Sequence, residues 1–223
     1  MIPNPYPGSF FAFEGIDGSG KSTQFKLATQ DLEEKLHSHG YAGVGKKVVT
    51  TKEPRSERFW GAHIYDDLFR QGGLHSHNLF GFQTWFALDS RDNYREVIIP
   101  ALTHGKIVLS DRSRASMVFG AQTPLQIPEL MRMNMSIIGP DFIWPDAIFI
   151  FDIDPEKAVA RCRSAERRLD GHENIETLSV VRENYIALAR DYPNCHLVNA
   201  ESTPAEIFEH VRGTIYSVID SKK

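Results

Sequence analysis

Five short apolar runs recur along the chain. They occupy residues 10–13, 47–51, 106–112, 145–152 and 195–199. The run at 145–152 is apolar without polar alternation, which is typical of strands buried on both faces of a parallel sheet. These runs predict five short β-strands.

The segments between the runs carry the signals of helices. After the first run, apolar residues repeat at helical spacing: Phe25, Leu27, Ala28, Leu32 and Leu36. Further helices are predicted over most of 56–103 with a break at 71–78, over 115–138 with two interruptions, from 154–155 onward, over 174–192, and over 203–219. The last begins with a capping box, Thr203-Pro-Ala-Glu206. Strands alternating with helices predict an α/β fold, a parallel sheet with helices on both faces.

A glycine-rich phosphate-binding pattern, Gly15-x-x-x-x-Gly20-Lys21-Ser22, follows the first strand directly. A strand, a glycine loop and a helix in this order form the context of a P-loop. The glycines let several backbone N–H groups point at one phosphate, Lys21 can reach the outer phosphates, and Ser22 can bind Mg²⁺. The alternative is a glycine-rich turn without a ligand. The predicted ATP-phosphate-binding residues are Gly15, Gly18, Ser19, Gly20, Lys21, Ser22 and Thr23.

Charged side chains follow two further strands. Glu53 comes after the second run, and Asp111-Arg112 end the third. The carboxyl ends of strands lie on the ligand side of an open α/β sheet. Asp111 is therefore placed to orient Mg²⁺ or its waters, and Arg112 is placed to clamp a phosphate. An exposed charged turn at Glu53 and a structural ion pair at Asp111-Arg112 are the alternatives.

Two arginine-containing segments are candidates for ligand contact. Phe86 belongs to an aromatic stripe that precedes Arg91 on one predicted helix; core packing and a surface arginine are the ordinary interpretation. The segment at about 161–174 is dense in arginine. Near a triphosphate site it could close as a lid, with Arg163, Arg167 and Arg168 as candidates for stabilising the transferring phosphate. A solvated charged face is the alternative.

Composition narrows the class of protein. A net charge of −4 and scattered basic residues argue against a nucleic-acid polymer as partner. No apolar run approaches the ~18 residues of a membrane span, and the first residues lack a signal-peptide pattern. Cys162 and Cys195 have no partner motif, so we expect reduced thiols in a cytoplasmic protein. The 223 residues fit one domain, 1–223.

In their order and spacing, these motifs resemble the thymidylate kinase family, the nucleoside-monophosphate kinases that phosphorylate dTMP with ATP. The resembling segments are 14–24, 51–54, 86–91, 110–116, 145–155 and 181–189. The resemblance extends from about Phe10 to Val211. It implies a five-stranded parallel P-loop kinase fold, a homodimer, Mg²⁺ as cofactor, ATP as phosphoryl donor, and a mobile arginine-bearing lid.

The resemblance also implies roles for single residues. Lys21 and Ser22 would hold ATP phosphates and magnesium, and Asp111 would support the metal. Asp17 and Arg112 would contact the acceptor monophosphate. The implied catalytic residues are these two, Lys21 and the lid arginines. The implied substrate-binding residues are Asp17, Glu53, Phe86, Arg91, Arg112, Ser116 and Glu173.

Several positions depart from the family pattern. Lys52 replaces an arginine, Ser113 a tyrosine, and Gly171 a lid arginine, while Phe119-Gly-Ala-Gln122 stands in place of Ala-Tyr-Gln. These changes fall on the monophosphate side and the lid. The predicted function is phosphoryl transfer from ATP to a nucleoside monophosphate, with dTMP favoured over purine nucleotides. The alternatives are a kinase for another nucleoside monophosphate and a nucleotide-binding protein of kinase fold with little transfer activity.

Overall fold

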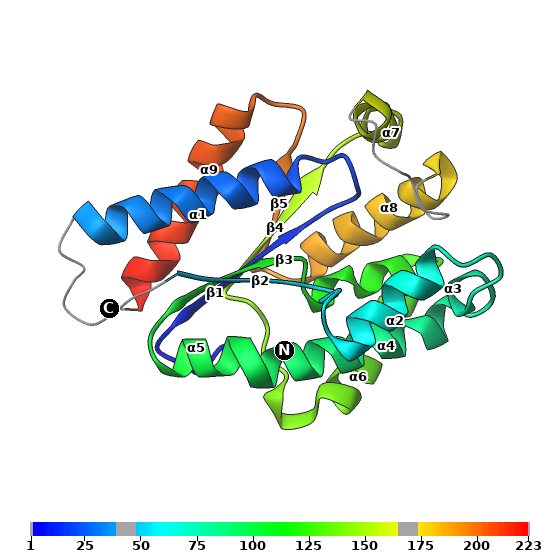
Figure 1. The fold of residues 1–223 in the computed structure, drawn as a ribbon. Helices are drawn as coiled ribbons and strands as arrows, with labels where there is room; N and C mark the ends of the chain where they lie inside the picture. The colour runs from blue at the N-terminus through cyan, green and yellow to red at the C-terminus, as the bar shows by residue number, and fades with distance from the viewer. Residues whose placement is uncertain (1, 39–47, 165–173, 223) are drawn as a thin grey trace.

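A single parallel sheet forms the centre of the protein, and its strands run in the order β2-β3-β1-β4-β5 (Figure 1). The computed structural model describes residues 2–38, 48–164 and 174–222. The strands are β1 Ser9–Glu14, β2 Val48–Lys52, β3 Ile107–Asp111, β4 Ala147–Asp152 and β5 Cys195–Asn199. The predicted five-stranded α/β fold is confirmed, with strand ends within two residues of the predicted ones.

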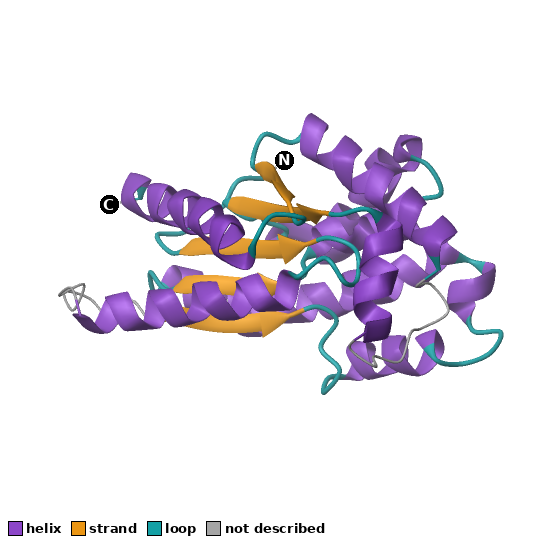
Figure 2. Cartoon of the chain, turned by 90° about the horizontal axis from the view of Figure 1, so that it is seen from above, coloured by secondary structure: helices purple, strands orange, loops and turns teal. Residues whose placement is uncertain are grey.

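Helices lie on both faces of the sheet. They are α1 Lys21–Ser38, α2 Phe59–Leu68, α3 Leu74–His77, α4 Leu79–Asn93, α5 Ile99–Thr103, α6 Ile127–Ile138, α7 Pro155–Ser164, α8 Ile175–Asp191 and α9 Pro204–Ser221. α1 and α9 pack together across one face, which Figure 2 views from above, whereas α5 and α8 lie on the other. Within the described ranges, no helix combines the length and the apolar character that crossing a bilayer requires.

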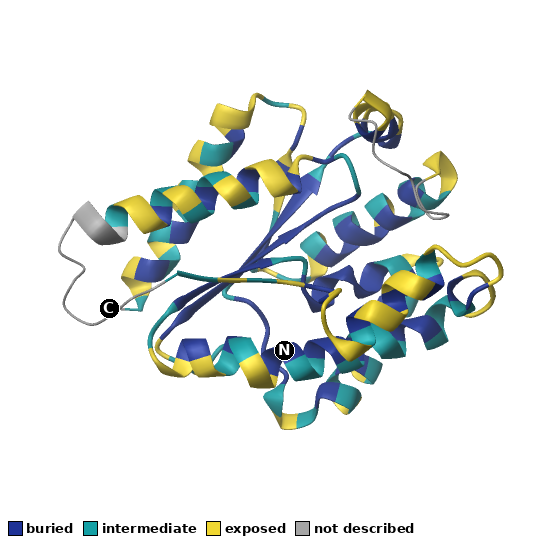
Figure 3. Ribbon diagram, viewed as in Figure 1, coloured by how far each residue is buried: buried dark blue, intermediate teal, exposed yellow. Residues whose placement is uncertain are grey.

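The apolar core is built around β1 and β4. All six residues of β1 are buried, because β1 is the middle strand and both its faces are covered. The ring of Phe13 lies 5.4 Å from Phe25, 5.4 Å from Phe149 and 6.1 Å from Phe151, measured between centroids. Burying a side chain of this kind contributes roughly 1.5–3 kcal/mol. Figure 3 shows these strands in dark blue beneath helices with one exposed side.

Two predicted helix starts are confirmed at the level of hydrogen bonds. Before α7, the Asp154 carboxylate accepts from the backbone N–H groups of Glu156 and Lys157 at 2.9 and 3.3 Å. Before α9, the Thr203 hydroxyl accepts from the Glu206 N–H at 3.3 Å, while Glu206 accepts from the Thr203 N–H at 2.9 Å. These caps satisfy backbone donors that have no partner inside the helix.

The prediction of a helix from residue 115 is wrong in its first half. Residues Arg114–Gly120 and Pro124–Gln126 form 3₁₀ turns, and an α-helix begins only with α6. Thr123 is extended, at φ −145° and ψ 156°, because a following proline disfavours the α conformation. The 3₁₀ turn Arg114–Gly120 matters for the site, because it carries Ser116 and Phe119 to the cavity wall.

The predicted break at 71–78 contains a one-turn helix, α3. Its first backbone donors, the N–H groups of Leu74 and His75, are bonded to the Asp67 carboxylate at 2.8 and 2.9 Å. Asp67 lies on α2, so the contact that stabilises this turn comes from outside the segment. A local sequence pattern could not have revealed it.

Candidate active site

A cavity of about 560 Å³ opens at the carboxyl ends of β1, β2 and β3. One part of its wall is polar and comes from the loop after β1, the start of α1 and the end of β3: Asp17, Gly18, Gly20, Lys21, Ser22, Thr23, Asp111 and Arg112. Another part is mainly apolar and comes from α2, α4 and the 3₁₀ turn: Tyr65, Leu68, Leu79, Phe82, Phe86 and Phe119. The cavity therefore offers charge for phosphates and rings for a base.

The glycine loop is packed closely against neighbouring backbone. Gly18 has φ +80°, and a Cβ atom there would lie 2.3 Å from the carbonyl oxygen of Ala158 on α7. Gly15 has φ +134°, and a Cβ atom would lie 2.7 Å from the carbonyl oxygen of Phe151 on β4. Only glycine meets both the space and the backbone conformation. The loop has the close, left-handed turns of the predicted P-loop.

Lys21 is the first residue of α1, and its side chain curls back over the loop. Its ammonium donates to the carbonyl oxygens of Gly15 and Ile16, both at 3.0 Å, and lies 3.5 Å from the Asp17 carboxylate. Burial, together with the positive charge of Arg112, lowers the pKa of Lys21 to about 8. An anionic phosphate placed beside this group would favour its charged form.

Arg112 takes a left-handed backbone conformation, with φ 68°, directly after β3. Such a conformation is strained for a residue other than glycine, and it is held by the Arg112 N–H bond to Phe13 O at 3.0 Å. Its guanidinium donates to the Gly15 carbonyl at 3.1 Å and to the Asp17 carboxylate at 2.9 Å. The turn thereby directs the arginine back to the P-loop, and Asp17 bridges Arg112 and Lys21.

Asp111 and Ser22, the predicted metal ligands, line the same cavity. Among the described residues there is no group of three or more His, Cys, Asp or Glu side chains that could hold a metal alone. Mg²⁺ in nucleotide enzymes is held by one or two protein oxygens together with phosphate oxygens and waters. One carboxylate and one hydroxyl beside a P-loop fit that requirement.

A buried carboxylate missed by the sequence analysis, Glu14, fixes the end of β1. It is 0 % exposed and accepts from the Ser113 N–H at 2.7 Å, the Ser116 hydroxyl at 2.7 Å and the Tyr185 hydroxyl at 2.7 Å. Glu14 thus joins β1, the chain after β3 and α8. The available signal was a carboxylate ending an otherwise apolar strand, where a buried charge needs several donors.

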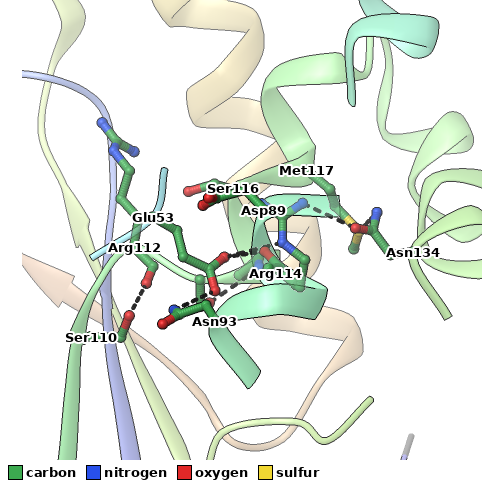
Figure 4. A network of polar contacts seen from close by, with 12 residues as sticks. Glu53, Asp89, Asn93, Ser110, Arg112, Arg114, Ser116, Met117 and Asn134 are labelled. Carbon is green, nitrogen blue, oxygen red and sulfur yellow. Dashed lines mark hydrogen bonds and ion pairs between the residues drawn. The ribbon is translucent and has the colours of Figure 1, made fainter. Parts of the chain in front are cut away.

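A polar network around Glu53 lies behind another part of the wall (Figure 4). The Glu53 carboxylate is 4 % exposed and lines the cavity. It accepts from the Ser90 hydroxyl, from the Asn93 amide at 3.1 Å and from the Arg114 Nε at 3.2 Å. Nearby, burial and the charge of Glu53 raise the pKa of Asp89 to about 6. The sequence indicated Glu53 but not its partners.

The remaining predicted substrate residues are placed unequally. Phe86 and Ser116 line the cavity, and the Ser116 hydroxyl is engaged with Glu14. Arg91 does not line it; its guanidinium lies 3.2 Å from the Asp92 carboxylate on the same helix. The structure therefore brings Phe86 to the cavity but not the arginine predicted with it. A helical stripe does not fix where a later residue on that helix points.

The predicted lid is only partly within the described residues. Arg163 lies on α7, is exposed and does not line the cavity. Arg161, two residues earlier, does line it and donates to the Ala200 carbonyl at 3.2 and 3.3 Å. Arg167, Arg168, Gly171 and Glu173 lie outside the described residues. Gln83, Phe82 and Phe119 are further cavity residues that the sequence analysis did not select.

The fold and this site together define a P-loop nucleotide kinase. A glycine loop joins the middle strand to α1, and an aspartate-arginine pair ends the neighbouring parallel strand beside it. A family model described as thymidylate kinase matches residues 13–211 of the chain. The protein belongs to the thymidylate kinase family.

Individual relatives agree with this assignment. The thymidylate kinase of Nitratidesulfovibrio vulgaris is 31% identical, and the match covers 95% of this chain and 98% of the relative. The thymidylate kinase of Caldicellulosiruptor saccharolyticus is 30% identical, with coverages of 96% and 99%. A probable thymidylate kinase of Thermococcus gammatolerans is 29% identical, with coverages of 93% and 96%. The similarity therefore extends over almost the whole of each chain.

Proposed function

We propose that the protein transfers the terminal phosphoryl group of ATP to dTMP, giving ADP and dTDP. The observation that carries the proposal is Asp17, which bridges the P-loop cation Lys21 and the strand-end cation Arg112. Two cations on one carboxylate leave positive charge where two phosphate groups must meet. Membership of the thymidylate kinase family supports dTMP as the acceptor.

On the donor side, the loop and Lys21 would hold the ATP phosphates. The start of α1 contributes its positive helix end, and Ser22 and Thr23 lie in the same wall. The Lys21 ammonium, now bonded to loop carbonyls, would instead donate to the outer phosphate oxygens. Charge develops on these oxygens during transfer, so a fixed cation there lowers the barrier.

On the acceptor side, Arg112 would clamp the monophosphate. Its guanidinium offers paired N–H donors, and its orientation is fixed by Gly15 and Asp17. Asp17 would also accept from the sugar hydroxyl. The two phosphates would then be held by residues that follow the adjacent strands β1 and β3, which is the positioning that phosphoryl transfer needs.

Magnesium is part of the proposal. The Ser22 hydroxyl and the Asp111 carboxylate would hold it with the ATP phosphates, and it would neutralise phosphate charge. The lid arginines Arg163, Arg167 and Arg168, with Glu173, are proposed to complete the site from the lid. The homodimer and the cytoplasmic location implied by the sequence stay predictions; sedimentation equilibrium of the full chain would test the first.

The decisive experiment is a coupled ADP-release assay with saturating ATP and Mg²⁺. The acceptors are dTMP, dUMP, UMP, dCMP, dGMP and AMP. The proposal expects the highest kcat/KM for dTMP and lower values for both purine nucleotides. A purine nucleotide that outranks dTMP would refute the thymidylate assignment. Calorimetric binding of ATP and dTMP without ADP release would instead favour a nucleotide-binding protein with little transfer activity.

A further inference from the structure

The Arg112 guanidinium has an aromatic contact in addition to its two hydrogen bonds. Its central carbon lies over the Phe119 ring, 5.0 Å from the centroid. The bonds to Gly15 and Asp17 use two of the five N–H donors, and these donors all lie in the plane of the guanidinium. Such bonds hold an edge of the group. The Phe119 ring adds a contact of a different kind, the attraction between a cation and the negative face of a ring.

This pair of side chains is largely shielded from water. The Arg112 side chain is 17% exposed, and Phe119 is half-buried and packs against the apolar core. A cation and an aromatic ring attract each other more strongly where water is excluded, because water no longer screens the charge. We therefore expect the contact between Arg112 and Phe119 to contribute more than a similar contact at the open surface would.

The Phe119 ring is itself held by a residue of α8. Tyr185 meets it edge to face, with the centroids 6.1 Å apart and the ring planes at 85°. Tyr185 is buried, and its hydroxyl donates to the Glu14 carboxylate at 2.7 Å. Phe119 therefore has a neighbour whose own position is fixed at both the ring and the hydroxyl. A ring with such a neighbour can restrict the movement of the guanidinium that lies over it.

Phe119 has no group that could bind a phosphate itself. Its side chain carries neither a hydrogen-bond donor nor a charge, so any effect on phosphate binding must act through Arg112. A free arginine side chain samples many rotamers, and ordering it opposes binding. A guanidinium that is already held by Gly15, Asp17 and Phe119 has less freedom to lose when a phosphate binds. The ring should therefore favour phosphate binding by ordering the arginine beforehand.

We infer that Phe119 is a positioning residue for Arg112, and that its ring increases the affinity of the site for the phosphate of the acceptor nucleotide. Phe119 opens the segment 119–122, which departs from the family pattern, so that pattern does not assign this role. The inference rests on the proposed function, in which Arg112 clamps the acceptor monophosphate. The ring matters for the phosphate of the acceptor and not for its nucleoside.

The test compares the binding of dTMP with that of thymidine, because the two differ only in the phosphate. Calorimetry measures the affinity for each, directly for dTMP and by competition for thymidine. Phe119→Leu keeps an apolar side chain but removes the ring. It is expected to lower the ratio of dTMP affinity to thymidine affinity roughly three- to thirtyfold, the scale of a shielded contact between a cation and a ring. The KM for ATP should not change.

Two further variants serve as controls. Phe119→Tyr keeps a ring with a negative face, so its affinity ratio should match that of wild type. Phe208→Leu makes the same replacement on α9, where Phe208 is half-buried and packs against the core but does not line the cavity. This control should leave the affinity ratio unchanged.

The outcomes separate the inference from the proposed function. An unchanged ratio in Phe119→Leu would overturn the inference, whether both affinities fall together or neither falls, while phosphorylation of dTMP by the wild type would still support the proposed function. Wild-type protein that does not bind dTMP would overturn both. If Phe119→Leu does not fold, judged by its thermal transition, replacement of Phe119 by pentafluorophenylalanine decides. That residue keeps the ring but removes its negative face, so the ratio should fall as for leucine, and an unchanged ratio would overturn the inference.

Discussion

The two halves of the cavity wall are built in opposite ways. The P-loop half comes mostly from one continuous stretch, 14–23, and its side chains bond to backbone atoms a few residues away. The half around Glu53 joins the residue that follows β2 to α4, the 3₁₀ turn and α6. The first half has its geometry set by local backbone. The second exists only after distant elements have packed.

The largest effect expected from the difference between the two halves is that of Lys21→Ala. The P-loop half should lose function without losing structure, because the Lys21 ammonium bonds to loop carbonyls and takes no part in the apolar core. We expect kcat to fall roughly a hundredfold or more, the scale of removing one preorganised charge donor. Lys26→Ala, at an exposed position of the same helix, is the matched control. Unfolding, or turnover near the normal rate, would show that the assigned role is wrong.

Glu14→Gln addresses the junction between the two halves. One carboxylate oxygen becomes an NH₂ donor that faces the existing donors of Ser113 or of Ser116 and Tyr185. Unfolding in urea should show a loss of roughly 2–3 kcal/mol, because buried donors lose their acceptor. Glu34→Gln, exposed on α1, should leave the midpoint unchanged. A loss as small as that of this control would contradict a structural role for Glu14.

The second half should also respond to pH in a defined direction. The pKa of Asp89 is raised to about 6 from 3.8, so between these values the folded state binds more protons than the unfolded state. The contribution of Asp89 to the free energy of unfolding is therefore fully present below about pH 4. It decreases by roughly 1–2 kcal/mol as the pH rises through 6. Urea unfolding at pH 4.5 and 6.5 should show this slope in wild type and a flatter one in Asp89→Asn. If stability depends on pH equally in wild type and in Asp89→Asn, a group other than Asp89 causes the pH dependence.

The smallest expected effect concerns the lid, which neither half contains. At least one of the variants Arg163→Ala, Arg167→Ala and Arg168→Ala should lower kcat about tenfold with little change in the KM for dTMP. The reason is that the arginine removed would stabilise charge only during phosphoryl transfer. Steady-state kinetics of the three variants measure this. Three unchanged kcat values would remove the lid arginines from the mechanism. Arg190→Ala, exposed on α8, is the control.

What the sequence could predict follows the same division. The five strands, the P-loop residues and the Asp111-Arg112 pair were found because each depends on a short stretch and on the rule for strand ends. Arg91 was selected from its place on a helix, and it faces Asp92. Arg114 and Gln83 carried no local signal, since their surroundings come from Glu53, Asn134 and Gly120. Contacts between distant elements are the part that periodicity and motifs do not encode.

The contact between Gly18 and Ala158 restricts which substitutions this sequence can accept. A Cβ atom at position 18 would meet a main-chain oxygen rather than a side chain. A clash between two side chains can be relieved by a compensating replacement at the partner position, but every residue at 158 carries the same carbonyl. No second-site substitution at 158 can therefore rescue a change at Gly18. This contact therefore restricts position 18 to glycine unless α7 itself moves, and it places no restriction on the side chain at 158.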